Sequence, residues 1–473
     1  MKKITLLFIL LTTSLLSAQN FTNVSNSLAQ LQNSITCWID INNDGVQELY
    51  LAGNTVAGMN GGLYNYENGI FNLMSNTGLP VLDNGAAKAG DFDNDGYLDL
   101  FILGYDENNS VAITDIYLNN GDNTFSAMNL SLPLCYLGDV QMVDINNDGL
   151  LDIAFTGMET TGYTNISKIY KNTSSGTIVE LTATPITGMM MGKIRFADYD
   201  ADGFQDFVLN GWDNVTDNAY TKIWHNNGDE TFTETADVFP TLWLGDMEWG
   251  DYDNDGDQDL IISGTSSSDS EVHLYQNNAG TFTEITGTGL PNVHLSALEW
   301  ADFNNDGIID LYLTGNEYVT TPATNRYRGA IFINDGTGVF TENTNVYITP
   351  ITYGDAAASD FDGDGYTDLI VSGVNDIGNP FSVCYKNAAA GSVNDAEMIK
   401  VSVYPNPISD RFTIYSDNNY TCKIYSITGN LVFEQTDFKA GTLQIDASKW
   451  ARGIYLLEIQ SDIKKIIKKL IIK

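Results

Sequence analysis

The sequence predicts an all-β fold, a seven-bladed β-propeller followed by a small carboxyl-terminal β-sandwich, from three observations. A nine-residue loop of the form Asp-x-(Asp/Asn)-x-Asp-Gly-x-x-(Asp/Glu) occurs seven times among 473 residues, at intervals of 51 to 58 residues. An apolar strand follows every copy, and the remaining residues of each interval contain further short strands and Asn/Gly turns. A period near 50 residues is typical of repeat folds in which each repeat is one small sheet.

Each repeat is expected to form four strands. The first runs into the loop, as in residues 247–250, and the second leaves it and ends at a glycine 13 residues after the first loop Asp. The third carries an apolar–aromatic pair such as Ile116-Tyr117, and the fourth, such as residues 231–234, follows a turn. Short strands separated by Asn/Gly turns are typical of propeller blades. The glycines are Gly53, Gly104, Gly157, Gly211, Gly264, Gly315 and Gly373.

The seventh repeat lacks a fourth strand of its own, because its pattern stops near residue 387. The missing strand is expected at the other end of the chain. Phe21 precedes Asp40 by 19 residues, as Phe125 precedes Asp144. We therefore expect residues 20–24 to pair with residues near 381–386 and to close the ring, which removes open sheet edges.

The loops combine acidic oxygens with a turn glycine, a pattern that favours Ca²⁺. Side chains at positions 1, 3, 5 and 9 and the carbonyl at position 7 can converge on one cation, while the glycine at position 6 permits the chain reversal. Position 12 is apolar, unlike in an EF-hand. We expect up to seven structural calcium ions. The alternative is that the loops are Asx-type turns without metal.

The expected metal ligands follow the loop positions. Position 1 holds Asp40, Asp91, Asp144, Asp198, Asp251, Asp302 and Asp360. Position 3 holds Asn42, Asp93, Asn146, Asp200, Asp253, Asn304 and Asp362. Position 5 holds Asp44, Asp95, Asp148, Asp202, Asp255, Asp306 and Asp364. The position 7 carbonyls belong to Val46, Tyr97, Leu150, Phe204, Asp257, Ile308 and Tyr366. Position 9 holds Glu48, Asp99, Asp152, Asp206, Asp259, Asp310 and Asp368.

The charge is unevenly distributed along the chain. The net charge of −39 divides into −43 for residues 1–398 and +4 for residues 399–473. The side-chain ligand positions of the loops (1, 3, 5 and 9) account for 25 of the 61 acidic residues. A strongly acidic propeller argues against nucleic acid as a partner, since phosphate binding needs clustered Lys and Arg.

The amino-terminal residues 1–18 are expected to be a secretory signal peptide, with Lys2 and Lys3 before a short apolar core. No later segment has the apolar length of a transmembrane span. The four cysteines, Cys37, Cys135, Cys384 and Cys422, are too scattered for a disulfide framework and are interpreted as isolated buried thiols.

Residues 19–387 are assigned to the propeller. Its loops and trailing strands, for example Asp-Phe-Asp-Asn-Asp-Gly-Tyr-Leu-Asp-Leu at 91–100, resemble the FG-GAP/VCBS repeat family of integrin α-chains and secreted bacterial proteins. The resemblance implies a calcium-binding propeller. It does not imply an activity, because lectins, adhesins and some lyases share this fold.

Residues 388–398 are assigned to a linker and 399–473 to a small β-sandwich. Three motifs, at 403–407, 424–429 and 453–458, resemble the type A sorting domain of the Bacteroidota type IX secretion system. The resemblance implies the secretion machinery as a partner of residues 399–473, and release or surface attachment after the domain is removed.

The face opposite the calcium loops is expected to bind a ligand, because it carries the variable segments 105–114, 158–168, 212–221 and 316–329. The candidate ligand residues are Tyr136, Trp212, Trp243 and His294. Alternatively, these side chains pack between blades.

The sequence contains no recognisable catalytic signature, and its three histidines lie at non-equivalent positions. Four acids, Asp83, Asp139, Asp246 and Asp355, recur near the inner mouth and could supply an acid–base pair, or could instead hold the backbone. We therefore predict a non-catalytic binding or adhesion module for glycans or extracellular proteins, not an enzyme. The alternatives are a polysaccharide lyase or glycosidase built on the propeller, or a structural surface component.

Overall fold

The computed structural model describes residues 21–24, 27–174, 177–235, 239–266, 269–320, 323–388, 401–404, 408, 411–416, 419–427, 429–439, 441–460 and 465–472. The chain forms two compact units, Met1–Gly391 and Ser392–Lys473. The expected signal peptide and nearly all of the expected linker lie outside the described residues. Within these ranges, no helix has the length and apolar character that a membrane crossing requires.

The first unit consists of four-stranded antiparallel sheets. We call each sheet a blade and number the blades in chain order. Blade one contains β2 (Gln32–Ile39), β3 (Glu48–Thr55), β4 (Gly58–Glu67) and β5 (Ile70–Leu73). Blade two contains β6 (Asp83–Gly90), β7 (Asp99–Asp106), β8 (Val111–Asn119) and β9 (Phe125–Ala127). Blade three contains β10 (Cys135–Val143), β11 (Asp152–Glu159), β12 (Asn165–Ser174) and β13 (Thr177–Glu180).

The later blades repeat this order. Blade four contains β14 (Ile194–Ala197), β15 (Asp206–Asp213), β16 (Asn218–Asn226) and β17 (Phe232–Glu234). Blade five contains β18 (Met247–Gly250), β19 (Asp259–Thr265), β20 (Ser270–Asn278) and β21 (Thr281–Ile285). Blade six contains β22 (His294–Ala301), β23 (Asp310–Thr320), β24 (Ala323–Asn334) and β25 (Phe340–Glu342). Blade seven contains β26 (Ile351–Ser359), β27 (Asp368–Asn375), β28 (Pro380–Lys386) and β1 (Thr22–Asn23).

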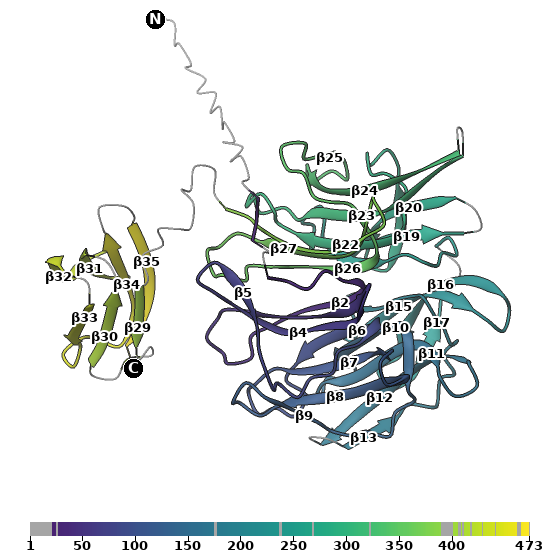
Figure 1. Cartoon of the computed structure of the whole chain (residues 1–473), viewed down its shortest axis with the longest axis horizontal. Coiled ribbons are helices and arrows are strands. Elements are labelled where there is room, and N and C mark those ends of the chain that lie inside the picture. Colours follow the sequence, from purple (N-terminus) through teal and green to yellow (C-terminus); the bar gives the residue numbers. More distant parts are fainter. Residues whose placement is uncertain are drawn as a thin grey trace, which may run out of the picture. The chain divides into compact units, whose positions relative to one another are not determined.

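The innermost strands close a ring. Each contacts the innermost strand of the next blade, in the order β2, β6, β10, β14, β18, β22 and β26, and β26 contacts β2. The purple first blade and the green last blade accordingly lie side by side in Figure 1. The all-β prediction is confirmed.

The closing strand also forms as predicted. Thr22 pairs with Lys386 and Asn23 with Tyr385, so β1 is the outer strand of blade seven. The Phe21 side chain packs in the apolar core between blades six and seven. The two ends of the propeller sequence are therefore held in one sheet.

The second strand of each blade is its most buried strand, because both of its faces are covered by neighbouring blades. In β7, Leu100 and Ile102 belong to the core shared with blade one, whereas Phe101 and Leu103 belong to the core shared with blade three. A strand that is buried on both faces has a continuous apolar sequence rather than an alternating one. This explains the apolar run after every loop.

The repeated glycine does not end the second strand, and that prediction is wrong. β7 continues past Gly104 to Asp106, and its ladder to β8 is unbroken. A Cβ at Gly104 would lie 2.9 Å from the carbonyl oxygen of Asp83 on the inner strand. The glycine is therefore required by the close approach of two strands, not by a turn.

The second unit has two sheets. One contains β29 (Val401–Tyr404), β30 (Arg411–Ser416) and β33 (Gly441–Asp446). The other contains β31 (Tyr420–Ser426), β32 (Leu431–Phe438), β34 (Gly453–Gln460) and β35 (Lys465–Ile472). Side chains of both sheets share one core, in which Phe412 of β30 and Leu457 of β34 are fully buried. This is the expected β-sandwich. The four cysteines of the chain are free and buried, as interpreted from the sequence.

Candidate functional site

The acidic loops connect the first and second strands of the blades, and their backbone is held by their own carboxylates. In blade two, Asp91 accepts hydrogen bonds from the backbone N–H of Asp95 at 3.1 Å and of Gly96 at 3.0 Å. Asp95 accepts from the N–H of Tyr97 at 2.8 Å. Gly96 has a φ of 95°, the left-handed conformation that glycine adopts at little cost. The same Asx-type bonds recur in the other loops, so the predicted chain reversal is present.

The carboxylates converge in four of the loops. The ligand atoms of each set lie within 4.8 Å of one another among the described residues. These sets are Asp91, Asp93 and Asp99; Asp198, Asp200 and Asp202; Asp251, Asp253 and Asp255; and Asp360, Asp362 and Asp368. Loops one, three and six carry Asn at position 3. The position 7 carbonyls remain a prediction.

Loops four and five contain buried carboxylate oxygens without a hydrogen-bond donor among the described residues, namely Oδ1 of Asp200, Oδ2 of Asp206 and Oδ1 of Asp253. A buried carboxylate oxygen without a donor is costly. A cation among these oxygens would satisfy them, so the donor set fits a hard divalent ion.

Position 9 has a second role that the sequence does not reveal. In blade two, Asp99 is fully buried and accepts hydrogen bonds from the N–H groups of Phe92 and Asn119, both at 2.8 Å. Its carboxylate thus joins the loop to the third strand. Burial raises the pKa of Asp99 to about 6, against these hydrogen bonds, and the nearby carboxylates of Asp93 and Asp95 raise it further.

An asparagine at the end of the third strand joins neighbouring blades. Asn119 donates from its side-chain amide to the carbonyl oxygen of Ile41 in loop one, at 2.9 Å. Equivalent bonds link blades two to seven to the loop before each of them. The other donors are Asn172, Asn226, Asn277, Asn334 and Asn387. Blade one has Tyr66 instead, whose ring meets Phe361 of loop seven edge-on at 4.7 Å.

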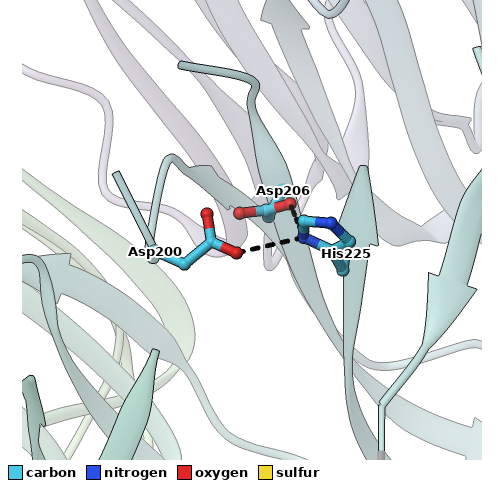
Figure 2. Close-up of side chains that lie close together, drawn as sticks. All are labelled: Asp200, Asp206 and His225. Atoms are coloured by element: carbon cyan, nitrogen blue, oxygen red, sulfur yellow. Dashed lines mark ion pairs between the residues drawn. The ribbon is translucent and has the colours of Figure 1, made fainter. Parts of the chain in front are cut away.

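In three blades the residue before this asparagine contacts carboxylates of the loop, and sequence reasoning missed it. In blade four it is His225, whose Nδ1 lies 3.2 Å from both Asp200 Oδ2 and Asp206 Oδ1 (Figure 2). In blade five it is Gln276, which donates to Asp253 Oδ2 at 2.7 Å. In blade seven it is Lys386, paired with Asp362. In the sequence these residues stand one position before the Asn, but the distance of that Asn from the loop varies, so only the strand ladders align these positions across blades.

The opposite end of the inner strands forms a strained mouth. Seven equivalent residues there have φ between 48° and 53°, which is uncommon for residues other than glycine. They are Asn33, Asn84, Leu137, Met191, Leu244, Leu295 and Tyr353, and all line one pocket. Backbone N–H groups link several of them in sequence, from Met191 to Leu137 at 2.8 Å and from Leu295 to Leu244 at 2.6 Å.

Three of the candidate ligand residues, Tyr136, Trp212 and Trp243, take part in aromatic pairs across blade boundaries. The Tyr136 ring lies 5.3 Å from that of Tyr105, and the Trp243 ring lies 4.6 Å from that of Trp212. All four side chains are half-buried. Their rings therefore take part in packing between blades while remaining partly exposed. His294 is held by Ser270, with 2.8 Å between its Nδ1 and the hydroxyl oxygen.

Three of the four acids near the inner mouth hold the next blade. Asp139, Asp246 and Asp355 accept hydrogen bonds from the N–H groups of Ile194, Leu298 and Thr36, at 3.0 to 3.1 Å. Asp83 is not equivalent to them, because it lies eight residues before its loop rather than five. Their arrangement matches the backbone-holding interpretation.

A second pocket lies inside the ring of inner strands and is lined by charged side chains. Arg195 is paired with Asp139, with Asp246 at 3.4 Å and with Glu248 at 2.8 Å. Glu299 and Lys88 also line this pocket. Burial, followed by the charges of Glu248, Asp355 and Asp246, raises the pKa of Glu299 well above its usual value.

The sequence matches known families over both units. Residues 40–102, 91–155, 144–209, 251–313 and 316–371 match the FG-GAP-like repeat. Residues 402–473 match the secretion system C-terminal sorting domain. An endo-acting ulvan lyase of Formosa agariphila is 39% identical over 77 residues. This match spans 15% of the chain and only 15% of the lyase.

Two solved structures show low overall similarity. An exo-β-1,3-galactanase of Phanerochaete chrysosporium is 12% identical, with a TM-score of 0.29 over 89% of this chain and 98% of that chain. A sucrose-6-phosphate hydrolase of Lactobacillus gasseri is 11% identical, with a TM-score of 0.31 over 93% of this chain and 91% of that chain. At such scores the similarity carries no argument about activity.

The sorting domain indicates export through the type IX secretion system to the cell surface or the extracellular space. The repeat matches together span more than half of the chain. The chain therefore belongs to the FG-GAP-like repeat family and ends in a secretion sorting domain.

Proposed function

We propose that this exported propeller is stabilised by calcium and serves as a non-catalytic binding module for a glycan or an extracellular protein. The observation that carries the proposal is the convergence of acidic oxygens in the loops, at the end of the inner strands opposite the mouth. The loops would provide rigidity, and the mouth and its variable segments would provide recognition.

Calcium would be held by the side chains at positions 1, 3, 5 and 9 and by the position 7 carbonyl, as in blade two by Asp91, Asp93, Asp95, Asp99 and Tyr97. The ion supplies positive charge that offsets the crowded carboxylates. Asp99 and its equivalents already tie each loop to the third strand of the same blade. Ion binding at the loop would therefore stabilise two strand connections at once.

The ligand would contact the mouth through the exposed parts of its aromatic pairs. Aromatic faces suit the stacking of sugar rings and the anchoring of protein partners. Trp243 and Tyr136 are the strongest candidates, because each also lies beside the ring of left-handed residues. This preference for binding over catalysis agrees with the roles of Asp139, Asp246 and Asp355 in holding the backbone.

An array of glycans and extracellular matrix proteins tests the proposal with the full chain, in calcium and in EGTA. We expect a specific ligand whose binding falls at least tenfold in Trp243→Ala or Tyr136→Ala. Tyr97→Ala is the matched control, because it removes the same kind of side chain on the loop face. Unchanged binding by both mouth variants would contradict the proposed ligand face.

The alternative function is a polysaccharide lyase or glycosidase acting at the central pocket. The observation that favours it is Glu299, a pocket carboxyl with a raised pKa near Lys88 and Arg195. Carboxyls with raised pKa are suited to general acid catalysis. Turnover on a polysaccharide panel that includes ulvan, abolished in Glu299→Gln, would replace the binding proposal by this one.

A further inference from the structure

Loop seven differs from the other loops because a lysine enters its ligand set. Lys386 is the last residue of β28 and is only 2% exposed. Its ammonium is paired with the Asp362 carboxylate and lies 3.5 Å from Asp364 Oδ2. These carboxylates occupy positions 3 and 5 of the loop, which are predicted to hold the ion.

The strand ladders show that this lysine occupies the same place in its blade as His225 and Gln276 in theirs. Tyr385 pairs with Leu369 at the start of the second strand, as Trp224 pairs with Phe207. The next residue along the third strand contacts loop carboxylates in blades four, five and seven. The residues at this place in blades one to seven are Asn65, Leu118, Lys171, His225, Gln276, Ile333 and Lys386.

Lys171 provides the informative contrast, because it is the other lysine at this place. Its side chain is 24% exposed and pairs with Glu230, outside the loop. Its ammonium reaches no closer than 3.9 Å to Asp148. Among the described residues of the seven blades, Lys386 alone puts a buried ammonium onto the carboxylates of its loop.

An ammonium and a calcium ion compete for the same oxygens. The ammonium has three donors and no lone pair, so it cannot become a calcium ligand as an amide or carbonyl oxygen can. Two cations on the same two carboxylates also repel each other strongly. The pairing that Lys386 makes therefore places one positive charge at loop positions 3 and 5, where the ion would otherwise lie.

We propose that Lys386 is a built-in cation that replaces calcium in loop seven, so that the propeller binds at most six calcium ions. This inference rests on the proposed calcium binding of the other loops. Lys386 is also the ladder partner of Thr22 in the closing strand. The blade that joins the two ends of the propeller would then form without calcium.

The number of bound calcium ions tests the inference, measured by metal analysis of the full chain after gel filtration in calcium. Asp360→Asn, in loop seven, should leave the number unchanged. Asp91→Asn and Asp302→Asn, at the same loop position in blades two and six, should each lower it by one. Lys386→Met should raise the number by one, whereas Lys171→Met should leave it unchanged.

The outcomes separate the two proposals. A loss of one calcium ion in Asp360→Asn would overturn the role of Lys386 while leaving calcium binding intact. No bound calcium in the unmodified chain would overturn both. If Lys386→Met does not fold, the comparison of Asp360→Asn with Asp91→Asn still decides the question.

Discussion

The side-chain amide of Asn119 donates to the carbonyl oxygen of Ile41 at 2.9 Å, across 78 residues and the boundary between two blades. The same amide also donates to Leu98 at 3.2 Å, inside the acidic loop of its own blade. Successive loops are therefore mechanically linked. A change in one loop should be transmitted to its neighbours through these asparagines.

Asn119→Ala should lower the free energy of unfolding by about 2–3 kcal/mol, because it leaves buried carbonyls without a donor. Denaturant unfolding measures this change. Asn120→Ala is the control, since Asn120 is exposed and its substitution should cost no more than about 0.5 kcal/mol. Equal effects of the two variants would show that the link between loops contributes nothing.

Calcium should raise the melting temperature. A site with Kd near ~10⁻⁴ M adds roughly 1.4 kcal/mol at ~1 mM calcium, and six sites would shift Tm on the order of 10 °C. Thermal unfolding in calcium and in excess EGTA measures the shift, and magnesium should produce a smaller one. Superimposable unfolding curves would show that calcium does not stabilise this fold.

Phe21→Ala should destabilise the propeller by about 1–3 kcal/mol through loss of core packing at the closing blade. The Phe21 ring lies 6.2 Å from the ring of Phe303 in blade six. Thr22→Ala serves as the control, because Thr22 is exposed and keeps its backbone pairing with Lys386. If both substitutions prove neutral by denaturant unfolding, the closing strand is not held by its side chains.

Glu299→Gln should stabilise the protein near pH 7, because the substitution removes a carboxyl that is harder to ionise in the folded state than in the unfolded chain. Burial raises the pKa of Glu299 in the folded state, so the native protein holds this proton more tightly than the unfolded chain. The stability contributed by Glu299 is therefore lost as pH rises above its unfolded pKa, and the gain from Gln should shrink toward pH 4.

The control for this pH dependence is Glu342→Gln, at an exposed strand position. It should change stability little at either pH. If Glu299→Gln stabilises the protein more at pH 4 than at pH 7, the pKa of Glu299 is not raised in the folded state. Urea unfolding at the two pH values measures both variants.

Much of the fold was predictable because its signals lie within short stretches of sequence. The loop at 91–99, the apolar run after it and the 19-residue offset of Phe21 follow from covalent spacing. The role of Gly104 was misread as a strand end, because the clash that requires glycine comes from Asp83, 21 residues earlier. Such close approaches between strands leave no local signal.

In the candidate sites, too, local sequence signals were readable and contacts between distant residues were not. The loop carboxylates were identifiable from sequence, but their neighbours were not. The sequence indicates Tyr136, Trp212 and Trp243 as ligand residues, but it does not show that Tyr136 pairs with Tyr105 or that Trp212 pairs with Trp243. The backbone bonds of Asp139 cross a blade boundary, so no spacing within one repeat could reveal them.

By itself, the sequence determined the all-β class, the acidic loops and the closing strand, because hydrophobic pattern and loop chemistry act over a few residues. Only the tertiary structure decided what faces each loop. Lys386 meets Asp362 because two antiparallel strands return the chain to the loop, and the residue carried back is not constrained by the loop motif. At loop seven, therefore, the charge that faces the motif is decided by the strand that returns to it and not by the motif itself.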